Sequence, residues 1–240
     1  MKLIVIVPTY NEAESLPRLV SALFLIPLDV SLLVVDDNSP DGTGELADRI
    51  SVDHPGKVSV IHRPGKLGLR SAYLMGFKQA LESEVDAVVQ MDADFSHDPA
   101  CLEAMADRLV TCQVVLGSRY IKGGRVDERW SIWRKALSAW GNFYASTILR
   151  MPIRDVTTGY RMWRADALRG LPLERVQSNG YVFLVEMAYL AHQMGYKFGE
   201  VPIYFADRRF GRSKMSFRIQ VEAALRIWQL LWTYRDLRSK

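Results

Sequence analysis

The sequence predicts a single α/β domain of 240 residues, with a mostly parallel central sheet and helices on both faces of that sheet. Three observations support this class. Short runs of β-branched residues alternate with longer segments of helical periodicity, the pattern of strand–helix–strand units. Acidic and polar residues directly follow several strands, at the carboxyl ends where parallel sheets bind ligands. No linker or low-complexity stretch divides the chain, so one core is expected.

Five apolar runs in the first half are predicted strands: Leu3–Val7, Leu32–Val35, Val58–Ile61, Val85–Met91 and Val114–Leu116. Four segments with helical spacing lie between them: Glu12–Phe24, Gly42–Ser51, Gly68–Leu81 and Pro99–Leu109. The rest of the chain is predicted to form helices over residues 129–149, 178–194 and 217–234, a short strand after the polar loop 155–161, and a strand at Val201–Phe205. The last of these helices is amphipathic.

The central motif is VVQMDADFSHDP at residues 88–99. It reads as a buried strand that ends in two carboxylates, and in an extended chain Asp92 and Asp94 point to the same side. Such a pair can address one hard divalent cation, because Mg²⁺ is usually held by one or two carboxylates together with substrate phosphates. The alternative is an acidic strand-to-helix turn, in which Asp98 and Pro99 cap the next helix.

The first two strands also end in polar residues. The sequence PTYNE at residues 8–12 contains Tyr10, whose ring offers a face on which a base can stack. It is not the G-x-G-x-x-G of dinucleotide sites, which weighs against a dehydrogenase. After the second strand, we assign Asp36 and Asp41 to turn and cap chemistry and Asp37 to ligand binding.

Basic residues gather in predicted loops. Lys66 and Arg70 lie at the start of a helix, where phosphate can be held. Arg119 follows a strand at the edge that carries Asp92 and Asp94, so its planar fork can either neutralise a diphosphate or pair with those aspartates. The segment 208–214 has four cations in seven residues, which favours a mobile, phosphate-binding loop.

Charge divides the chain into an acidic and a basic part. Residues 1–100 carry 8 Lys and Arg against 15 Asp and Glu, a net charge of −7, and residues 101–240 carry 23 against 12, a net charge of +11. This asymmetry suits a metal–nucleotide complex in one part and an anionic partner in the other, although solvated surface charge gives the same count. The cations are scattered over several loops without a nucleic-acid-binding module, so no nucleic-acid partner is expected.

Aromatic and basic residues alternate in the segment 129–149, which begins RWSIWRKALSAW. As a helix, this composition fits either a membrane interface or a core-facing tryptophan stripe with solvated arginines. No apolar run reaches the roughly 18 residues of a membrane-spanning helix. Cys101 and Cys112 have neither metal-ligand nor disulfide spacing, which favours a reducing location. Glu186, within the helix over 178–194, can be either a sugar-binding acid or a buried structural one.

These motifs together resemble the GT-A-fold family 2 glycosyltransferases, and within them the dolichyl- or polyprenyl-phosphate mannose synthases. The resemblance runs from Val5 to about Ser216. It rests on the combination of PTYNE, VDDNSPDGT, MDADFSHDP, GSRY, DVTTGYR, SNGYVF and EVPIYF-x-DRRFGRSKM. It implies a nucleotide-binding half over about residues 1–118 and an acceptor- and membrane-facing half over about residues 119–240.

The resemblance also implies roles for individual residues. The guanosine of a GDP-sugar would be held by Pro8, Tyr10, Glu12, Val35 and Asp37. A DxD-type motif would be formed by Asp92, Ala93 and Asp94, with Asp94 the main ligand of Mg²⁺ or Mn²⁺ bridging the diphosphate. The donor phosphates or the lipid phosphate would be contacted by Arg119, Arg134, Arg208 and Lys214. Two positions depart from the family, because Leu184 replaces a glutamine and Arg70 a small residue, which puts sugar or acceptor contacts in question.

The activity implied is inverting transfer of mannose from GDP-mannose to a polyprenyl or dolichyl phosphate, giving the β-mannosyl phosphate and GDP. The acceptor phosphate is already anionic, so no general base is required, and positioning and charge supply the catalysis. We expect His97 to be an exposed loop residue. The location implied is the cytoplasmic face of a membrane, bound peripherally, with an integral membrane anchor subunit as a further possible partner.

Two alternatives remain at this point. A UDP-glucose or other UDP-sugar polyprenyl-phosphate transferase would share the fold, since a single sequence does not show the contacts that separate guanine from uracil. A non-catalytic nucleotide-binding membrane scaffold is a different class of protein. The pair Asp92 and Asp94, together with the cations above, argues against the scaffold, because a scaffold needs no such convergence.

Overall fold

The computed structural model describes residues 1–207 and 217–237, and only the backbone of residues 217–221. Seven strands form one sheet in the order β3-β2-β1-β4-β7-β5-β8. Their bounds are β1 Lys2–Thr9, β2 Asp29–Asp36, β3 Val58–His62, β4 Ala87–Gln90, β5 Val114–Ser118, β7 Arg161–Arg164 and β8 Phe198–Pro202. All neighbours pair in parallel except β7, which is antiparallel to both β4 and β5. The predicted α/β class and the mostly parallel sheet are confirmed.

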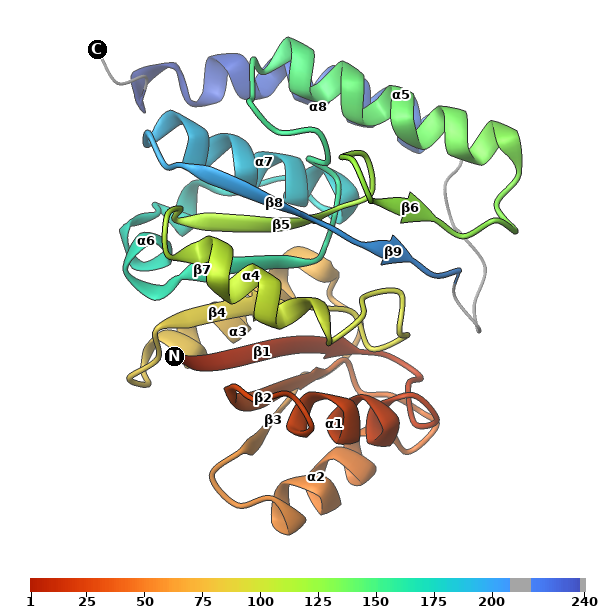
Figure 1. Cartoon of the computed structure of the whole chain (residues 1–240), viewed down its shortest axis with the longest axis vertical. Helices are drawn as coiled ribbons and strands as arrows, with labels where there is room; N and C mark the ends of the chain where they lie inside the picture. Colours follow the sequence, from red (N-terminus) through yellow and green to blue (C-terminus); the bar gives the residue numbers. More distant parts are fainter. Residues whose placement is uncertain (208–216, 238–240) are drawn as a thin grey trace.

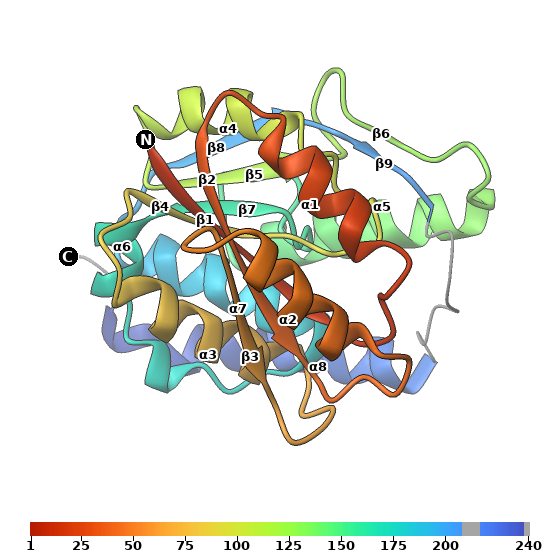
Figure 2. The same cartoon turned by 90° about the horizontal axis from the view of Figure 1, so that it is seen from below.

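Helices cover both faces of this sheet. On one face lie α1 Leu16–Phe24, α2 Thr43–Asp53 and α4 Cys101–Leu109, and on the other lie α3 Leu69–Leu81, α6 Ala165–Gly170 and α7 Gly180–Gln193. Figure 2 shows α4 on one side of the sheet, with α3 and α7 on the other. Along β1, Leu3 and Val5 pack against the first group while Ile4 and Ile6 pack against the second. Burial on both faces explains why the strands read as continuous apolar runs.

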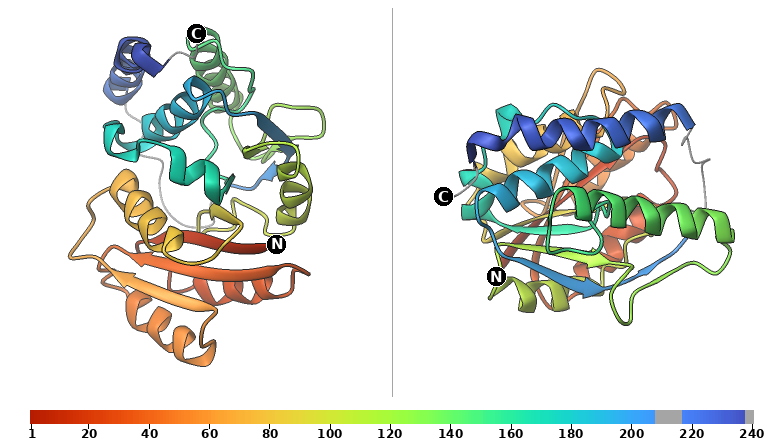
Figure 3. Two further views of the ribbon diagram at one scale, coloured as in Figure 1. Left: turned by 90° about the vertical axis from the view of Figure 1, so that its left-hand side faces the viewer. Right: turned by 90° about the horizontal axis from the view of Figure 1, so that it is seen from above.

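Two long helices form a third layer. These are α5 Ile132–Ile148 and α8 Phe217–Thr233, which lie together at one end of the molecule, at the top of Figure 1, and side by side in Figure 3. Leu230 and Tyr234, at the end of α8, are fully buried in the core cluster that contains α7. Neither these helices nor any other in the described part of the chain is long and apolar enough to cross a bilayer.

Several element boundaries differ from the sequence expectation. Helix α1 begins at Leu16 and not at Glu12, because the amides of Ser15 and Leu16 both donate to the carbonyl of Glu12 and close a turn first. Proline then occupies the first helical turn, where it needs no hydrogen-bond acceptor. Helix α4 begins at Cys101, since Asp98 caps a turn by accepting from the amide of Ala100 and not the helix itself.

The predicted strand Val201–Phe205 is in fact two strands. Strand β8 begins three residues earlier, at Phe198, and ends at Pro202, and β9 Tyr204–Phe205 leaves the main sheet to pair with β6 Arg125–Val126. This small second sheet and helix α6 were not expected from the sequence. The small sheet matters for the site because it directs Asp207, directly after β9, toward the start of α5.

Candidate active site

The carboxyl ends of β1, β2, β4 and β5 meet at one edge of the sheet. The antiparallel β7 brings its own beginning to this edge, since Arg161 pairs in register with both Gln90 and Leu116. The polar loop 155–160, which precedes β7, therefore joins the loops that follow the parallel strands. The sequence predicted where those loops would meet, but it did not predict that this fifth loop would join them.

The loops after β1 and β2 are tied together by hydrogen bonds. The amide of Glu12 donates to Thr43 Oγ1 at 2.9 Å, and the amide of Ala13 donates to Asp41 Oδ2 at 3.2 Å. Asp36, fully buried, accepts from the hydroxyl of Thr9 at 2.9 Å. The turn and capping roles assigned to Asp36 and Asp41 are confirmed, and the result is a rigid cradle at the edge of the sheet.

Asp37 forms a buried ion pair that the sequence did not reveal. Its Oδ1 lies 2.5 Å from Nη1 of Arg63, and Nη2 of the same arginine donates to the hydroxyl of Ser71. Burial raises the pKa of Asp37, against the charges of Arg63 and Lys66, which lower it. Strands β2 and β3 pair so that Asp36 faces His62, and Asp37 therefore faces Arg63 one step further on. The sequence did not reveal this ion pair because it does not show the parallel register of β2 and β3.

The other predicted nucleotide residues border the same cradle. Tyr10 is exposed, and the ammonium of Lys66 lies 3.8 Å from the centre of its ring, so a stacking base has the other face of the ring. Pro8 and Glu12 are half-buried beside it. Val35 is fully buried in the core, so only its main chain can face a ligand.

The two central carboxylates follow β4, which ends at Gln90, one residue earlier than predicted. The chain bends at residues 93–97, so the extended conformation expected over Asp92 and Asp94 is wrong. Asp94 Oδ1 accepts from the amide of Ser96, which folds the bend back on itself. Both carboxylates are half-buried, and Ala93 between them is buried. The hydroxyl of Tyr73 donates to the carbonyl of Met91, the residue before Asp92, at 3.4 Å. Burial raises the pKa of Tyr73 far above its usual range, and the charges of Asp92 and Asp94 add to this increase while Arg161 opposes it.

His97 is buried, which corrects the expectation of an exposed loop residue. Its Nδ1 accepts from the amide of Asp92 at 3.0 Å, and its ring stacks on Tyr160 with centroids 4.9 Å apart. Phe205 packs against the same ring edge-on. The imidazole therefore holds in place the backbone of residues 92–97, called here the acidic bend.

Arg119 pairs with Asp155 and not with the acidic bend. Its Nε and Nη2 donate to the two carboxylate oxygens at 2.7 Å each, its amide donates to Oδ2, and Nη2 also reaches Thr157 Oγ1. Burial alone would lower the pKa of Arg119, but Asp155 outweighs burial and holds the pKa above its ordinary value. Asp155, which the sequence placed only in a polar loop, is thus the residue that orients this arginine.

A pocket of about 500 Å³ opens beside these groups. Its wall includes the polar and charged side chains of Asp92, His97, Arg119 and Thr157. It also includes the apolar side chains of Leu69, Leu137 and Leu184. Arg134 and Asp207 line it as well, joined by an ion pair of 2.9 Å. The lining therefore suits a ligand that carries both an anionic group and an apolar part.

The two departures from the family pattern have different outcomes. Arg70 donates to the carbonyls of Val176 and Gln177, so it fastens α3 to the loop before α7 and is not directed toward a phosphate. Leu184 does line the pocket. Both Leu184 and Asp92 border Gly159, since a Cβ added there would lie 3.9 Å from a methyl of Leu184 and 3.9 Å from Asp92 Oδ1.

Glu186 is structural. It is fully buried and accepts from the amides of Gln177 and Ser178, at 3.1 and 2.6 Å, and from the hydroxyl of Tyr234 at 3.0 Å. This carboxylate therefore joins α7 to the end of α8 and to the loop that leads into the pocket.

Replacing Glu186 by alanine is expected to lower the free energy of unfolding by about 2–4 kcal/mol, because the amides of Gln177 and of the buried Ser178 lose their acceptor and a buried cavity is left. The hydroxyl of Tyr234 keeps, among the described residues, only the carbonyl of Arg175 as its acceptor. Urea unfolding measures this change, with the exposed Glu174→Ala as the control, expected within about 0.5 kcal/mol of wild type. A variant of wild-type stability that has lost only turnover would instead make Glu186 a substrate contact.

Arg208 and Lys214 lie outside the described residues. Among the described residues, no group of three or more His, Cys, Asp or Glu side chains is arranged to hold a metal ion. A cation at Asp92 and Asp94 would therefore need ligands from the substrate as well, which is usual for Mg²⁺ on a diphosphate.

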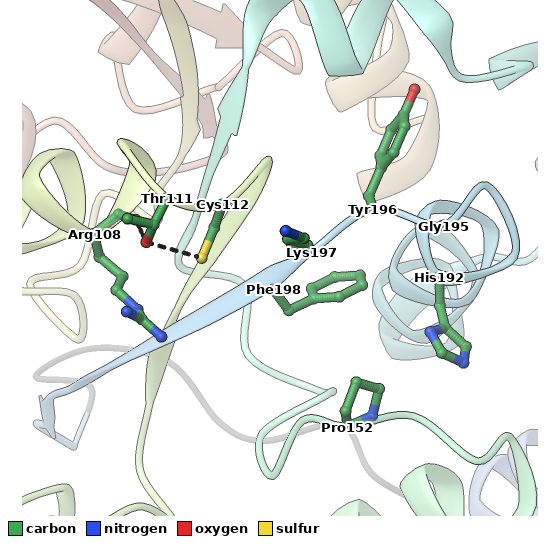
Figure 4. Close-up of a pocket in the computed structure, with 9 residues that line it drawn as sticks. All are labelled: Arg108, Thr111, Cys112, Pro152, His192, Gly195, Tyr196, Lys197 and Phe198. Carbon is green, nitrogen blue, oxygen red and sulfur yellow. Dashed lines mark hydrogen bonds between the residues drawn. The ribbon is translucent and has the colours of Figure 1, made fainter.

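A second hollow lies at the other end of β5 and β8, lined by residues that include Arg108, Cys112, His192 and Lys197 (Figure 4). Arg108 stands in the last turn of α4, where the helix dipole favours positive charge. His192 stands in the last turn of α7, and burial lowers its pKa. Cys112 is buried and contacts the hydroxyl of Thr111. Helix-end chemistry accounts for these side chains, so we place no site here.

The cradle, the acidic bend and the arginine-lined pocket lie together at the carboxyl edge of an open α/β sheet, which is where enzymes of this architecture bind their ligands. Residues 4–171 match the model of the family described as Glycosyl transferase family 2, and the chain belongs to this family of glycosyltransferases.

Individual relatives agree over nearly the whole chain. The chain is 41% identical to undecaprenyl-phosphate mannosyltransferase of Micrococcus luteus, over 100% of this chain and 99% of that protein. It is 42% identical to polyprenol monophosphomannose synthase of Mycolicibacterium smegmatis, over 89% and 80%. A crystal structure of glucosyl-3-phosphoglycerate synthase from Mycobacterium tuberculosis, in complex with Mn²⁺, UDP and glucosyl-3-phosphoglycerate, superposes with a TM-score of 0.64 at 15% identity, over 97% of this chain and 79% of that one. At 15% identity, this similarity supports a shared fold and nothing more specific.

Proposed function

We infer that the protein transfers mannose from GDP-mannose to a polyprenyl phosphate, with inversion at the anomeric carbon. The observation that carries this proposal is one pocket whose lining combines Asp92 and two arginines with apolar side chains, among them Leu137 of α5. A lipid phosphate likewise combines a charged group with an apolar chain. The relatives from Micrococcus luteus and Mycolicibacterium smegmatis, which are named as polyprenyl-phosphate mannose enzymes, support the choice of acceptor and sugar.

The donor is assigned to the cradle and the acidic bend. The nucleoside would lie between Tyr10 and the buried Asp37, with Arg63 holding that carboxylate in place. Asp92 and Asp94 fit Mg²⁺ or Mn²⁺, because two half-buried carboxylates on one bend supply oxygen ligands and leave the remaining positions to the diphosphate. When bound, the cation would neutralise charge on the departing nucleotide. The related fold that holds Mn²⁺ and UDP supports a divalent metal in this role.

The acceptor is assigned to the pocket. Arg119, held by Asp155, and Arg134, held by Asp207, present guanidinium groups to its phosphate. No general base is required, because this phosphate is anionic before it attacks. The residues of the chain act by placing the two substrates in line and by stabilising charge on the leaving diphosphate.

The exposed surface of α5 and α8 is assigned to a membrane. Its exposed apolar side chains, called here the aromatic face, are Ile132, Trp133, Leu137, Trp140 and Phe143 of α5 and Leu225, Trp228 and Trp232 of α8. Of the three tryptophans in the segment 129–149, only Trp130, just before α5, is buried, so the alternative of a tryptophan stripe facing the core is wrong. Tyr144 joins the two helices, since its hydroxyl donates to Ala224 O and accepts from Trp228 Nε1. Leu137 belongs both to this face and to the pocket wall, so a lipid acceptor can reach the pocket from the bilayer.

Transfer of labelled mannose from GDP-mannose to a short polyprenyl phosphate tests the proposal, with UDP-glucose in parallel. We expect lipid product from GDP-mannose alone, with Mg²⁺ or Mn²⁺, and its disappearance with EDTA. Product from UDP-glucose instead would assign the UDP-sugar alternative, and no product from either donor would leave the non-catalytic scaffold. The proposal also includes an integral membrane partner and a location at the cytoplasmic face of the membrane. Co-purification with membranes, compared between the wild type and a variant that lacks the side chains of the aromatic face, tests this association.

A further inference from the structure

One carboxylate in the pocket forms an ion pair with Arg134 but takes no direct part in the chemistry proposed above. Asp207 lines the pocket together with Arg119 and Arg134, where the acceptor is expected to place its phosphate. A negative charge at this place repels an anionic ligand and lowers its affinity, unless the same carboxylate aids binding in another way.

The contacts of Asp207 indicate what that function is. Its Oδ1 accepts from Nη1 of Arg134 at 2.9 Å and from Nε1 of Trp130 at 3.1 Å. The guanidinium of Arg134 in turn lies over the ring of Trp130, 3.7 Å from the ring centre. The three side chains therefore brace one another, and within the described residues this ion pair uses only one nitrogen of the Arg134 guanidinium.

The bracing carboxylate is itself anchored through its main chain. The amide of Asp207 donates to Oδ2 of the buried Asp127 at 2.9 Å, and the amide of Asp127 donates to the carbonyl of Phe205. These bonds extend the pairing of β6 with β9 up to the pocket. Substitution of the Asp207 side chain leaves them in place, so the effect of the carboxylate can be tested by itself.

We propose that Asp207 is a positioning residue for acceptor binding, which holds the Arg134 guanidinium against Trp130 so that its remaining N–H groups face the lipid phosphate. Arg134 is a long, partly exposed side chain on the first turn of α5, and fixing it before the ligand arrives removes the entropy cost of ordering it. The proposal deepens the function inferred above and rests on it.

A double-mutant cycle tests the proposal on the full-length protein with GDP-mannose and a short polyprenyl phosphate. Asp207→Ala is expected to raise the acceptor KM about tenfold with little change in the donor KM, and Arg134→Ala to raise it at least as much. In the Arg134→Ala background, adding Asp207→Ala should change nothing further, because the residue acts through that arginine. Asp207→Asn keeps both hydrogen bonds and should recover most of the acceptor affinity.

The control is Asp166→Ala, which removes an exposed ion pair with Arg164 far from the pocket. Additive effects of the two pocket substitutions would overturn the proposal, as would a lower acceptor KM in Asp207→Ala, which would show a carboxylate that competes with the substrate. Equal changes in the donor KM and the acceptor KM would show that Asp207 only supports the fold, and this result would also overturn the proposal. Mannose transfer by the wild-type protein is measured first. If it is absent, the proposed function is wrong, and this result is distinct from a failure of the proposal about Asp207 and Arg134.

Discussion

Replacing Asp94 by asparagine is expected to reduce mannose transfer about a thousandfold, the largest effect of any single substitution considered. Asparagine keeps an Oδ1 that can accept from the amide of Ser96, so the bend after β4 should retain its shape. What is lost is a full negative charge on the proposed cation. Asp92→Asn should also lower turnover strongly, while the bond from its amide to His97 survives the substitution.

Initial rates of lipid-linked product, titrated with Mg²⁺ and Mn²⁺, measure this effect, and calorimetry of donor binding with and without metal separates affinity from turnover. Asp98→Asn is the matched control, because this exposed carboxylate lies four residues further along and only caps a turn. It is expected to keep wild-type rates. An Asp94→Asn enzyme that stayed active and still responded to metal would remove the acidic bend from the chemistry.

Removing three tryptophans from the aromatic face is expected to abolish binding to lipid vesicles. Trp133 and Trp232 are 86% and 70% exposed, and Trp140 lies on the same face of α5. Burying such side chains in a bilayer interface contributes at least about 1 kcal/mol each, so the triple change to serine should weaken partitioning about a hundredfold or more. Exposed positions contribute little to folding, and the unfolding midpoint should stay near that of wild type.

Vesicle flotation and activity on two acceptors measure this change. With a long polyprenyl phosphate in vesicles the rate should fall with binding, whereas with a short, dispersed acceptor it should stay within about threefold of wild type. The matched control replaces Leu25, Val52 and Val110 by serine, since these are equally exposed apolar side chains away from α5 and α8. Equal losses in both triple variants, or an equal loss on both acceptors, would contradict a membrane-docking role.

Local patterns in the sequence were sufficient for much of the fold. The apolar runs and helical periods placed the strands and most helices, and α8 was predicted almost to the residue. Errors occurred at boundaries such as the start of α1, where the carbonyl of Glu12 closes a turn before the helix begins. They also occurred where pairing partners lie far away, as in β6 and β9, because two-residue strands carry no periodic signal.

In the candidate site, too, some features could be predicted from local sequence and others could not. Asp92 and Asp94 were found because they follow directly on a strand, and the order of the chain alone indicates such a position. The burial of His97 was not predicted, since its neighbours Tyr160 and Phe205 come from segments far along the chain.

The sequence by itself determined the α/β class, the edge of the sheet that carries the site, the position of the two carboxylates after a buried strand and the aromatic–basic helix. These features depend on residues that are near neighbours in the chain. Only the tertiary structure decided which charges pair: Asp37 with Arg63, Arg119 with Asp155, and Arg134 with Asp207. The physical reason is that each pair depends on strand register or direction, above all on the antiparallel β7, and the pairing of distant strands cannot be deduced from the local composition of either partner.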